Sequence, residues 1–166
     1  MRFAKLLSIV LAAVFVAGCA TVVTLRQPLA QMSVGNLQFR GIEATSTLTS
    51  VTPENIARLK MSVAERVSKL PKGDVPVKIE VVVTEFDIQS GATRLVAGAF
   101  SGSNKMTVSV KVIDPVGKTI ADFDVQRSGN PGGYGFFYSQ TDATINAVAD
   151  GIADVLSVKS GARRDL

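Results

Sequence analysis

Apolar and polar residues alternate along residues 75–83, where every second position from Val75 to Val83 is apolar. A period of two predicts a strand with one buried face. The parity inverts near Thr84, which predicts a bulge or bend at that position. The apolar residues beyond it, Phe86 and Ile88, are expected to serve another surface.

A hairpin is predicted by the same alternation in residues 105–114 and 119–127, which are separated by the turn sequence DPVGK. Directly paired residues of an antiparallel hairpin point to the same face. A loop of four residues therefore places Lys111 opposite Asp122. Asp122 and Asp124 then lie on the polar face of the sheet.

A weaker strand pattern covers residues 33–46, which mix β-branched and apolar residues with Gly35 and Gly41. Glycines inside a strand indicate a bulge or an edge position. We therefore expect this strand to be bulged or to lie at the edge of the sheet.

Two helices are predicted from apolar residues spaced three and four apart. The first begins with the N-cap Thr52, followed by a proline at the first helical position, and ends near Pro71. The second begins near Ser139, whose spacing from Asp142 resembles a capping box, and ends at residues 160–161. Their apolar stripes are Ile56, Leu59, Val63, Val67 and Leu70 in the first helix and Ile145, Val148, Ala149, Ile152 and Leu156 in the second.

In chain order these elements give β-α-β-β-β-α. Each has one apolar face, and packing both helices on one face of a mainly antiparallel sheet buries all of these faces together. The sequence therefore predicts an α+β fold with a sheet of about four strands and two helices on one face. One domain over residues 33–160 is expected, because a chain of this length supports a single core. Residues 161–166 are expected to form a mobile tail.

Residues 1–18 have the organisation of an export signal, in which two basic residues precede the apolar run 6–17. The run is shorter than the roughly 20 apolar residues that cross a bilayer, so we expect it to be cleaved. Its end, Val16 to Cys19, resembles the lipobox of bacterial lipoproteins. By that resemblance, cleavage falls between Gly18 and Cys19, and Cys19 receives the lipid.

Cys19 is the only cysteine of the chain and cannot form an internal disulfide. Lipidation explains why an exported protein has a single, unpaired cysteine. The alternative is a plain signal peptide with an incidental cysteine. Ala20 stands where lipoproteins kept in the inner membrane usually have Asp. The resemblance thus implies an outer-membrane anchor with the domain facing the periplasm. Residues 19–32 lack a strong period, which predicts a tether between lipid and domain.

The charge of the chain gives no indication of a nucleic-acid partner. The formal net charge is +4, and removal of the two basic residues of the signal lowers it to +2. No stretch interleaves Lys and Arg with aromatic residues, as a nucleic-acid face would.

Two glycine-rich stretches, 91–102 and 128–138, are candidate binding loops, although neither has the signature of a phosphate loop. They would display one arginine and several aromatic side chains to a partner. The alternative is that the aromatic residues pack against the domain as a lid or a helix staple. The candidate partner-binding residues are Arg94, Phe100, Tyr134, Phe136 and Phe137.

The sequence contains no recognisable catalytic constellation. It has no histidine, and its one thiol is assigned to lipid. Asp122 and Asp124 share a strand face about 7 Å apart. A solvated face explains them better than catalysis, which would need one carboxyl group in a desolvated position. We therefore expect a protein without enzyme activity, catalytic residues, metal site or cofactor.

The stretch from Arg94 to Gly102, the strand 105–113, the DPVGK turn and the alanine-rich closing helix resemble a family of bacterial lipoproteins known only as a domain of unknown function. The resemblance covers the last two thirds of the mature chain, although alanine and serine dilute its glycine run here. The β/α plan is also similar to the amino-terminal domain of TolB, to lipoproteins that activate peptidoglycan synthases, and to the periplasmic domain of the curli secretion lipoprotein. These are binding and assembly modules.

The leading hypothesis is a lipid-anchored periplasmic domain that binds another envelope protein or assembles with itself. One alternative is a subunit of a secretion or pore assembly, which would need long alternating membrane hairpins. The other alternative is a cell-envelope hydrolase.

Overall fold

Five strands and two helices make up the described part of the computed structural model, which comprises residues 20–27, 36–88, 104–129 and 139–157. In chain order they are β1 (Ala20–Gln27), β2 (Leu37–Ser46), α2 (Pro53–Val67), β3 (Val75–Asp87), β4 (Asn104–Ile113), β5 (Thr119–Gly129) and α4 (Gln140–Ser157). The strands form one sheet in the order β1-β5-β4-β3-β2. β2 runs parallel to β3, and the remaining neighbouring pairs are antiparallel. The predicted α+β class is confirmed.

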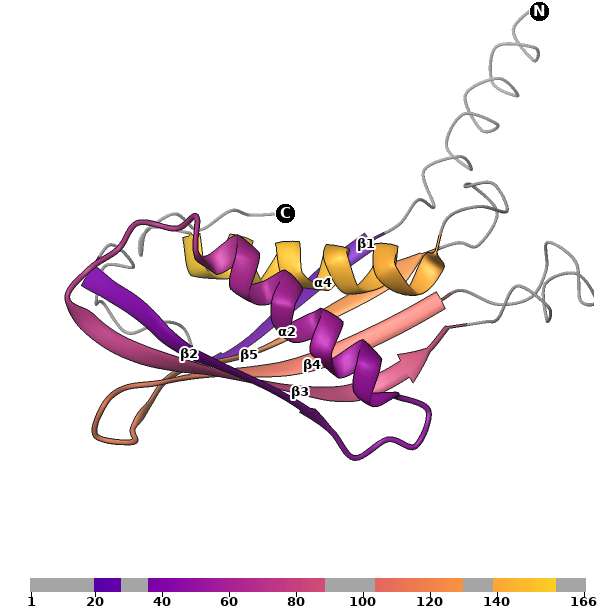
Figure 1. Ribbon diagram of the computed structural model, residues 1–166, viewed down its shortest axis with the longest axis horizontal. Coiled ribbons are helices and arrows are strands. Elements are labelled where there is room, and N and C mark those ends of the chain that lie inside the picture. Colours follow the sequence, from indigo (N-terminus) through magenta and orange to yellow (C-terminus); the bar gives the residue numbers. More distant parts are fainter. Residues whose placement is uncertain (1–19, 28–35, 89–103, 130–138, 158–166) are drawn as a thin grey trace, which may run out of the picture.

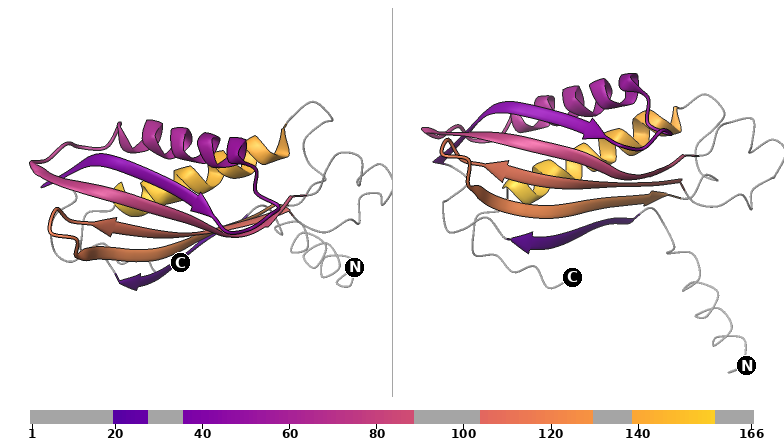
Figure 2. Two further views of the ribbon diagram at one scale, coloured as in Figure 1. Left: turned by 60° about the horizontal axis from the view of Figure 1, so that its bottom comes forward. Right: turned by 90° about the horizontal axis from the view of Figure 1, so that it is seen from below.

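Both helices cover the same face of the sheet, so the described elements form two layers (Figure 1). α2 contacts β2, α4 contacts β1, β4 and β5, and the helices contact each other. β1 and β2 lie at the two edges of the sheet (Figure 2). In these residue ranges, no helix is long and apolar enough to cross a membrane. The largest fully buried side chains of the core are Phe123, Leu37, Leu59, Ile79, Met106, Ile145, Ile152, Leu156, Val63, Val81, Val83 and Val108.

The predicted start signals cap both helices. The Thr52 side chain accepts a hydrogen bond from the Asn55 backbone N–H at 3.3 Å, and Pro53 is the first residue of α2. The Ser139 hydroxyl accepts a hydrogen bond from the Asp142 backbone N–H at 3.2 Å. Each cap satisfies an N–H group that has no partner within its own helix.

β3 contains the predicted bulge, because its register with β4 shifts between Val83 and Glu85. The expectation that the end of this strand serves another surface is wrong. Thr84 is the extra residue, so Phe86 returns to the face of Val83 and packs against the same core. The bulge thus compensates for the inverted parity of the sequence.

The β4–β5 hairpin has the predicted register, with Lys111 opposite Asp122. In its turn, Asp114 Oδ1 accepts hydrogen bonds from the backbone N–H groups of Val116 at 3.0 Å and Lys118 at 2.8 Å. Gly117 has a φ of 85°, a conformation that glycine adopts without steric penalty. The pairing shifts by one residue between this turn and the rest of the hairpin, so the turn closes the hairpin but does not by itself set the register.

β2 is an edge strand with a bulge between Phe39 and Gly41, as its glycine predicted. The chain crosses the start of β2 at Gly73, whose backbone N–H donates to the Leu37 carbonyl at 2.9 Å. A Cβ atom on Gly73 would lie 2.0 Å from the backbone carbon of Asn36. This crossing therefore requires glycine.

The sheet has five strands rather than about four. Residues 20–27, predicted as part of a tether over residues 19–32, instead form β1, which pairs with β5. The pattern missed this strand because Val22 and Val23 are adjacent and interrupt the alternation. Residues 21–27 are exposed, and an edge strand without a buried face needs no strict alternation.

The core assignment predicts opposite responses to charge on the two faces of the central hairpin. Val110→Asp should unfold the domain, because Val110 has no exposed surface. Burying an unpaired carboxylate costs several kcal/mol, against a total stability of about 5–15 kcal/mol. Asp124→Asn is the control and should change the melting temperature little, because a partly exposed ion pair contributes about 0–1 kcal/mol. Thermal melts showing the reverse order would contradict the assignment.

Candidate functional site

The site residues predicted from the sequence lie outside the residues that the structure describes. They are the cleavage and lipidation positions Gly18 and Cys19 and the loop residues Arg94, Phe100, Tyr134, Phe136 and Phe137. The candidate surfaces of the described part of the chain are formed by other residues, at the two edges of the sheet and between the helices.

Asp122 and Asp124 lie on the open face of the sheet, as predicted, and both bind Arg26 of β1. The Arg26 Nε donates to Asp122 at 2.9 Å, and a second nitrogen donates to Asp124. A third hydrogen bond reaches the Ser109 hydroxyl at 2.5 Å. The bonds to Asp122 and Asp124 raise the pKa of the Arg26 guanidinium. This cluster ties β1 to β5 and β4.

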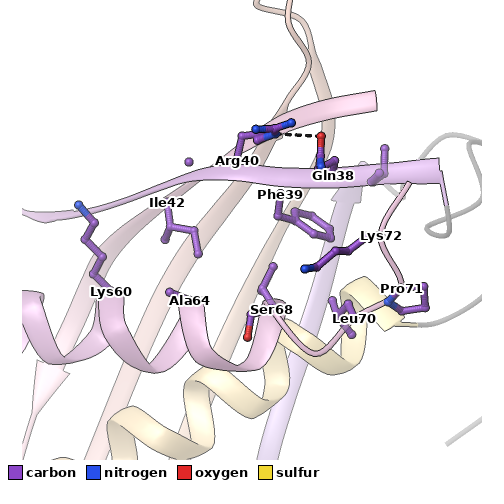
Figure 3. A pocket seen from close by; sticks show the side chains of 13 residues that line it. Gln38, Phe39, Arg40, Ile42, Lys60, Ala64, Ser68, Leu70, Pro71 and Lys72 are labelled. Atoms are coloured by element: carbon purple, nitrogen blue, oxygen red, sulfur yellow. Dashed lines mark hydrogen bonds between the residues drawn. The ribbon is translucent and has the colours of Figure 1, made fainter. Parts of the chain in front are cut away.

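A groove lies at the opposite edge of the sheet, between β2 and α2 (Figure 3). Its volume is about 410 Å³. Phe39 and Ile42 project from β2 towards the helix, while Ala64 approaches from α2 (Figure 3). Leu70 contributes from the segment after α2. The groove thus has a partly buried apolar floor beside an edge strand of the sheet.

The basic residues of this β2–α2 groove have no acidic partners among the described residues. Lys60 and Lys72 form no ion pair there, and Arg40 donates to the Gln38 side chain at 2.8 Å. By contrast, Lys78 and Lys105 are each paired with a glutamate of a neighbouring strand. An apolar floor flanked by unmatched ammonium groups suits an apolar segment that carries a carbonyl or carboxylate group.

A smaller hollow of about 240 Å³ lies between the helices, and polar pairs cross it. Arg58 binds Asp142, and the Ser62 hydroxyl donates to the Asn146 amide oxygen at 3.1 Å. The hydrogen bond from Arg58 lowers the pKa of the Asp142 carboxyl group. These pairs hold α2 against α4, and Met61 is the exposed apolar side chain beside them.

The β1 edge is the most apolar exposed strand of the described structure. Val22, Val23 and Leu25 are 49%, 38% and 55% exposed, and they are three of the six large hydrophobic residues with substantial exposure there. A run of exposed apolar side chains on an unpaired edge strand is a surface that another chain can cover.

The acidic groups do not suggest a metal centre. Within the ranges that the structure describes, no three Asp, Glu, Cys or His side chains gather closely enough to hold a metal ion.

Residues 43–133 match a family described as a domain of unknown function, DUF4410. The chain belongs to the DUF4410 family. The prediction of a domain-of-unknown-function module is therefore confirmed. The DUF4410 match includes α2, β3, β4 and β5 and ends before α4, so the closing helix that contributed to the predicted resemblance lies outside it.

Solved PelC dodecamers from Paraburkholderia phytofirmans share the fold of this DUF4410 protein. One has a TM-score of 0.60 and 11% identity, covering 85% of this chain and 100% of the PelC chain. A point variant has a TM-score of 0.57 and 14% identity, covering 84% and 98%. The similarity to a candidate lipoprotein from Caulobacter crescentus CB15 is weaker. Its TM-score is 0.43 at 10% identity, and it covers 75% of this chain and 89% of the lipoprotein chain. No curated protein matches the chain.

The close packing of α4 on β1 and β5 depends on Gly151. A Cβ atom there would lie 2.8 Å from Val125 Cγ1 and 3.0 Å from Thr21 Cγ2. Gly151→Ala should therefore lower the melting temperature, although alanine favours a helix by about 1 kcal/mol over glycine. Asp154→Ala, at an exposed position of the same helix, is the control and should not lower it. A raised melting temperature for Gly151→Ala would contradict close packing of α4 on β5 and β1.

Proposed function

We propose that this chain is a lipid-anchored, non-catalytic subunit of the cell envelope that assembles with copies of itself. The observation that carries the proposal is the pair of open sheet edges, one with exposed apolar side chains and the other with an apolar groove. Solved PelC chains with a similar fold occur as dodecamers, which supports self-assembly as the use of these edges.

The proposed anchor is a lipid on Cys19, with the domain on the periplasmic side of the outer membrane. β1 begins at Ala20, the next residue of the chain. A lipid on the mature N-terminus would therefore be joined directly to the edge of the sheet, without a tether between them. Copies held in this way would meet at the same height above the bilayer, which favours lateral contact between their edges.

Binding of a different envelope protein is the second candidate function. It is supported by Lys60 and Lys72, whose charges have no described partner beside the apolar floor of the β2–α2 groove. A secretion or pore complex is one setting in which such a subunit would work. The hydrolase alternative gains no support from Asp122 and Asp124, because both carboxylates bind Arg26.

Self-assembly predicts a mass above that of one chain for the full-length protein purified in mild detergent. Light scattering coupled to size-exclusion chromatography, with the detergent contribution subtracted, measures this mass. We expect one discrete multimer that persists on dilution into the micromolar range. A single species with the mass of one chain would contradict the proposal and favour a separate envelope partner.

The anchor predicts that Cys19→Ser blocks lipid attachment and leaves the protein unprocessed or released. Metabolic labelling with a palmitate analogue should mark the wild type and not the variant, because the thiol is the acceptor. Fractionation should show the wild type with the outer membrane. The anchor assignment is wrong if the variant is processed at the same site and fractionates as the wild type does.

A further inference from the structure

We propose that the β1 edge of one copy seats in the β2–α2 groove of the next copy, so that the sheet continues from molecule to molecule. The inference rests on the proposed function, because it names the surface through which self-assembly occurs. The occupant of the groove is a second copy of this chain.

The apolar side chains of the two surfaces lie on the same side of the sheet. Leu25 lies opposite Phe123, a residue buried beneath the helices, so it is on the helix side of the sheet. Val23, two residues earlier, shares that side. At the other edge, Ile42 lies opposite the buried Ile79 and is also on the helix side. Continuing the sheet thus brings the exposed apolar residues of β1 beside the apolar floor of the groove.

The directions of the strands also fit this contact. β5, β4 and β3 alternate in direction, β1 is antiparallel to β5, and β2 is parallel to β3. β1 therefore runs opposite to β2. When two copies are placed side by side in the same orientation, β1 of one copy meets β2 of the other as an antiparallel pair. This pairing is slightly more stable per residue than a parallel one.

The contact joins two different surfaces and is therefore head to tail. Each copy has one β1 edge and one groove, so every copy can bind a neighbour on both sides. Head-to-tail contacts produce a closed ring when the rotation between neighbours closes, and a filament when it does not. Rotation about one axis keeps every Ala20 at the same end of such a ring, where all anchors can reach one membrane.

The other surfaces offer less for a second copy to cover. Ion pairs link the strands of the open sheet face through Arg26, Lys78 and Lys105. The hollow between the helices is crossed by the pair of Arg58 and Asp142. Among the described residues, only the two sheet edges combine apolar surface with a strand whose outer side can pair with another strand.

Cysteine cross-linking of the full chain in its membrane tests the contact. Leu25→Cys is combined with Ala64→Cys, an exposed position that lines the groove, and a short bismaleimide is added. We expect a ladder of dimers, trimers and higher species on denaturing gels. Each single variant should give no ladder. Val116→Cys with Ala64→Cys is the matched control and should also give none, because Val116 lies in the hairpin turn.

A second variant gives an independent measure. Leu25→Lys places an ammonium group beside the basic groove residues and should shift the mass in detergent to that of one chain. That chain should stay folded, because Leu25 is 55% exposed. Val116→Lys makes the same chemical change at a position that is 86% exposed, and it should leave the multimer intact.

The results separate the inference from the proposed function. A multimer by mass that gives no ladder and tolerates Leu25→Lys overturns the contact while self-assembly stands. Dimers from the Leu25→Cys single variant would show that two β1 edges meet each other, which also overturns it. If Met61→Lys dissociates the multimer and Leu25→Lys does not, the helices form the contact instead. A wild-type protein with the mass of one chain overturns both proposals.

Discussion

The apolar layer between the sheet and the two helices is the interaction on which the rest of the structure depends. Its central row crosses three adjacent strands at Val81, Val110 and Phe123, each at most 1% exposed. Burying such a side chain contributes about 1.5–3 kcal/mol, whereas a partly exposed ion pair contributes about 0–1 kcal/mol. The buried rows therefore set the register, and the ion pairs of the open face follow it.

The two helices cover one face of the sheet and do not cover the outer sides of its edge strands, β1 and β2. α2 lies over β2 and α4 reaches β1, but no strand in the described part of the chain pairs with the outer side of either edge strand. Charge is distributed unevenly as well. The Lys78 ammonium group on the open face donates hydrogen bonds to Glu43 and Glu80, and these bonds raise its pKa. Lys60 and Lys72 at the groove have no acidic partner among the described residues. The β2 edge thus has both an apolar groove and lysine side chains without an acidic partner among the described residues.

The sequence predicts those elements that have one face in the core and the other in water. The β4–β5 hairpin alternates over most of its length because Val110 faces the core and Lys111 faces water, so the pairing of Lys111 with Asp122 could be derived. β1 could not be predicted, because neither of its faces is fully buried and alternation is not required. The groove could not be predicted either. It arises from the parallel pairing of β2 with β3, which brings Phe39 near α2, and this long-range pairing leaves no local signal in the sequence.

The family match and the similarity to PelC cover different extents of the molecule. Residues 43–133 contain the β3, β4 and β5 strands and α2, which form the stable centre of the sheet and half of the helical layer. β1, the groove residues Phe39 and Ile42, and α4 lie outside that range. The similarity to PelC spans 84–85% of the chain and therefore extends beyond the family match. A common central sheet does not specify what each member binds, because binding depends on the residues of a site and not on the fold that carries them.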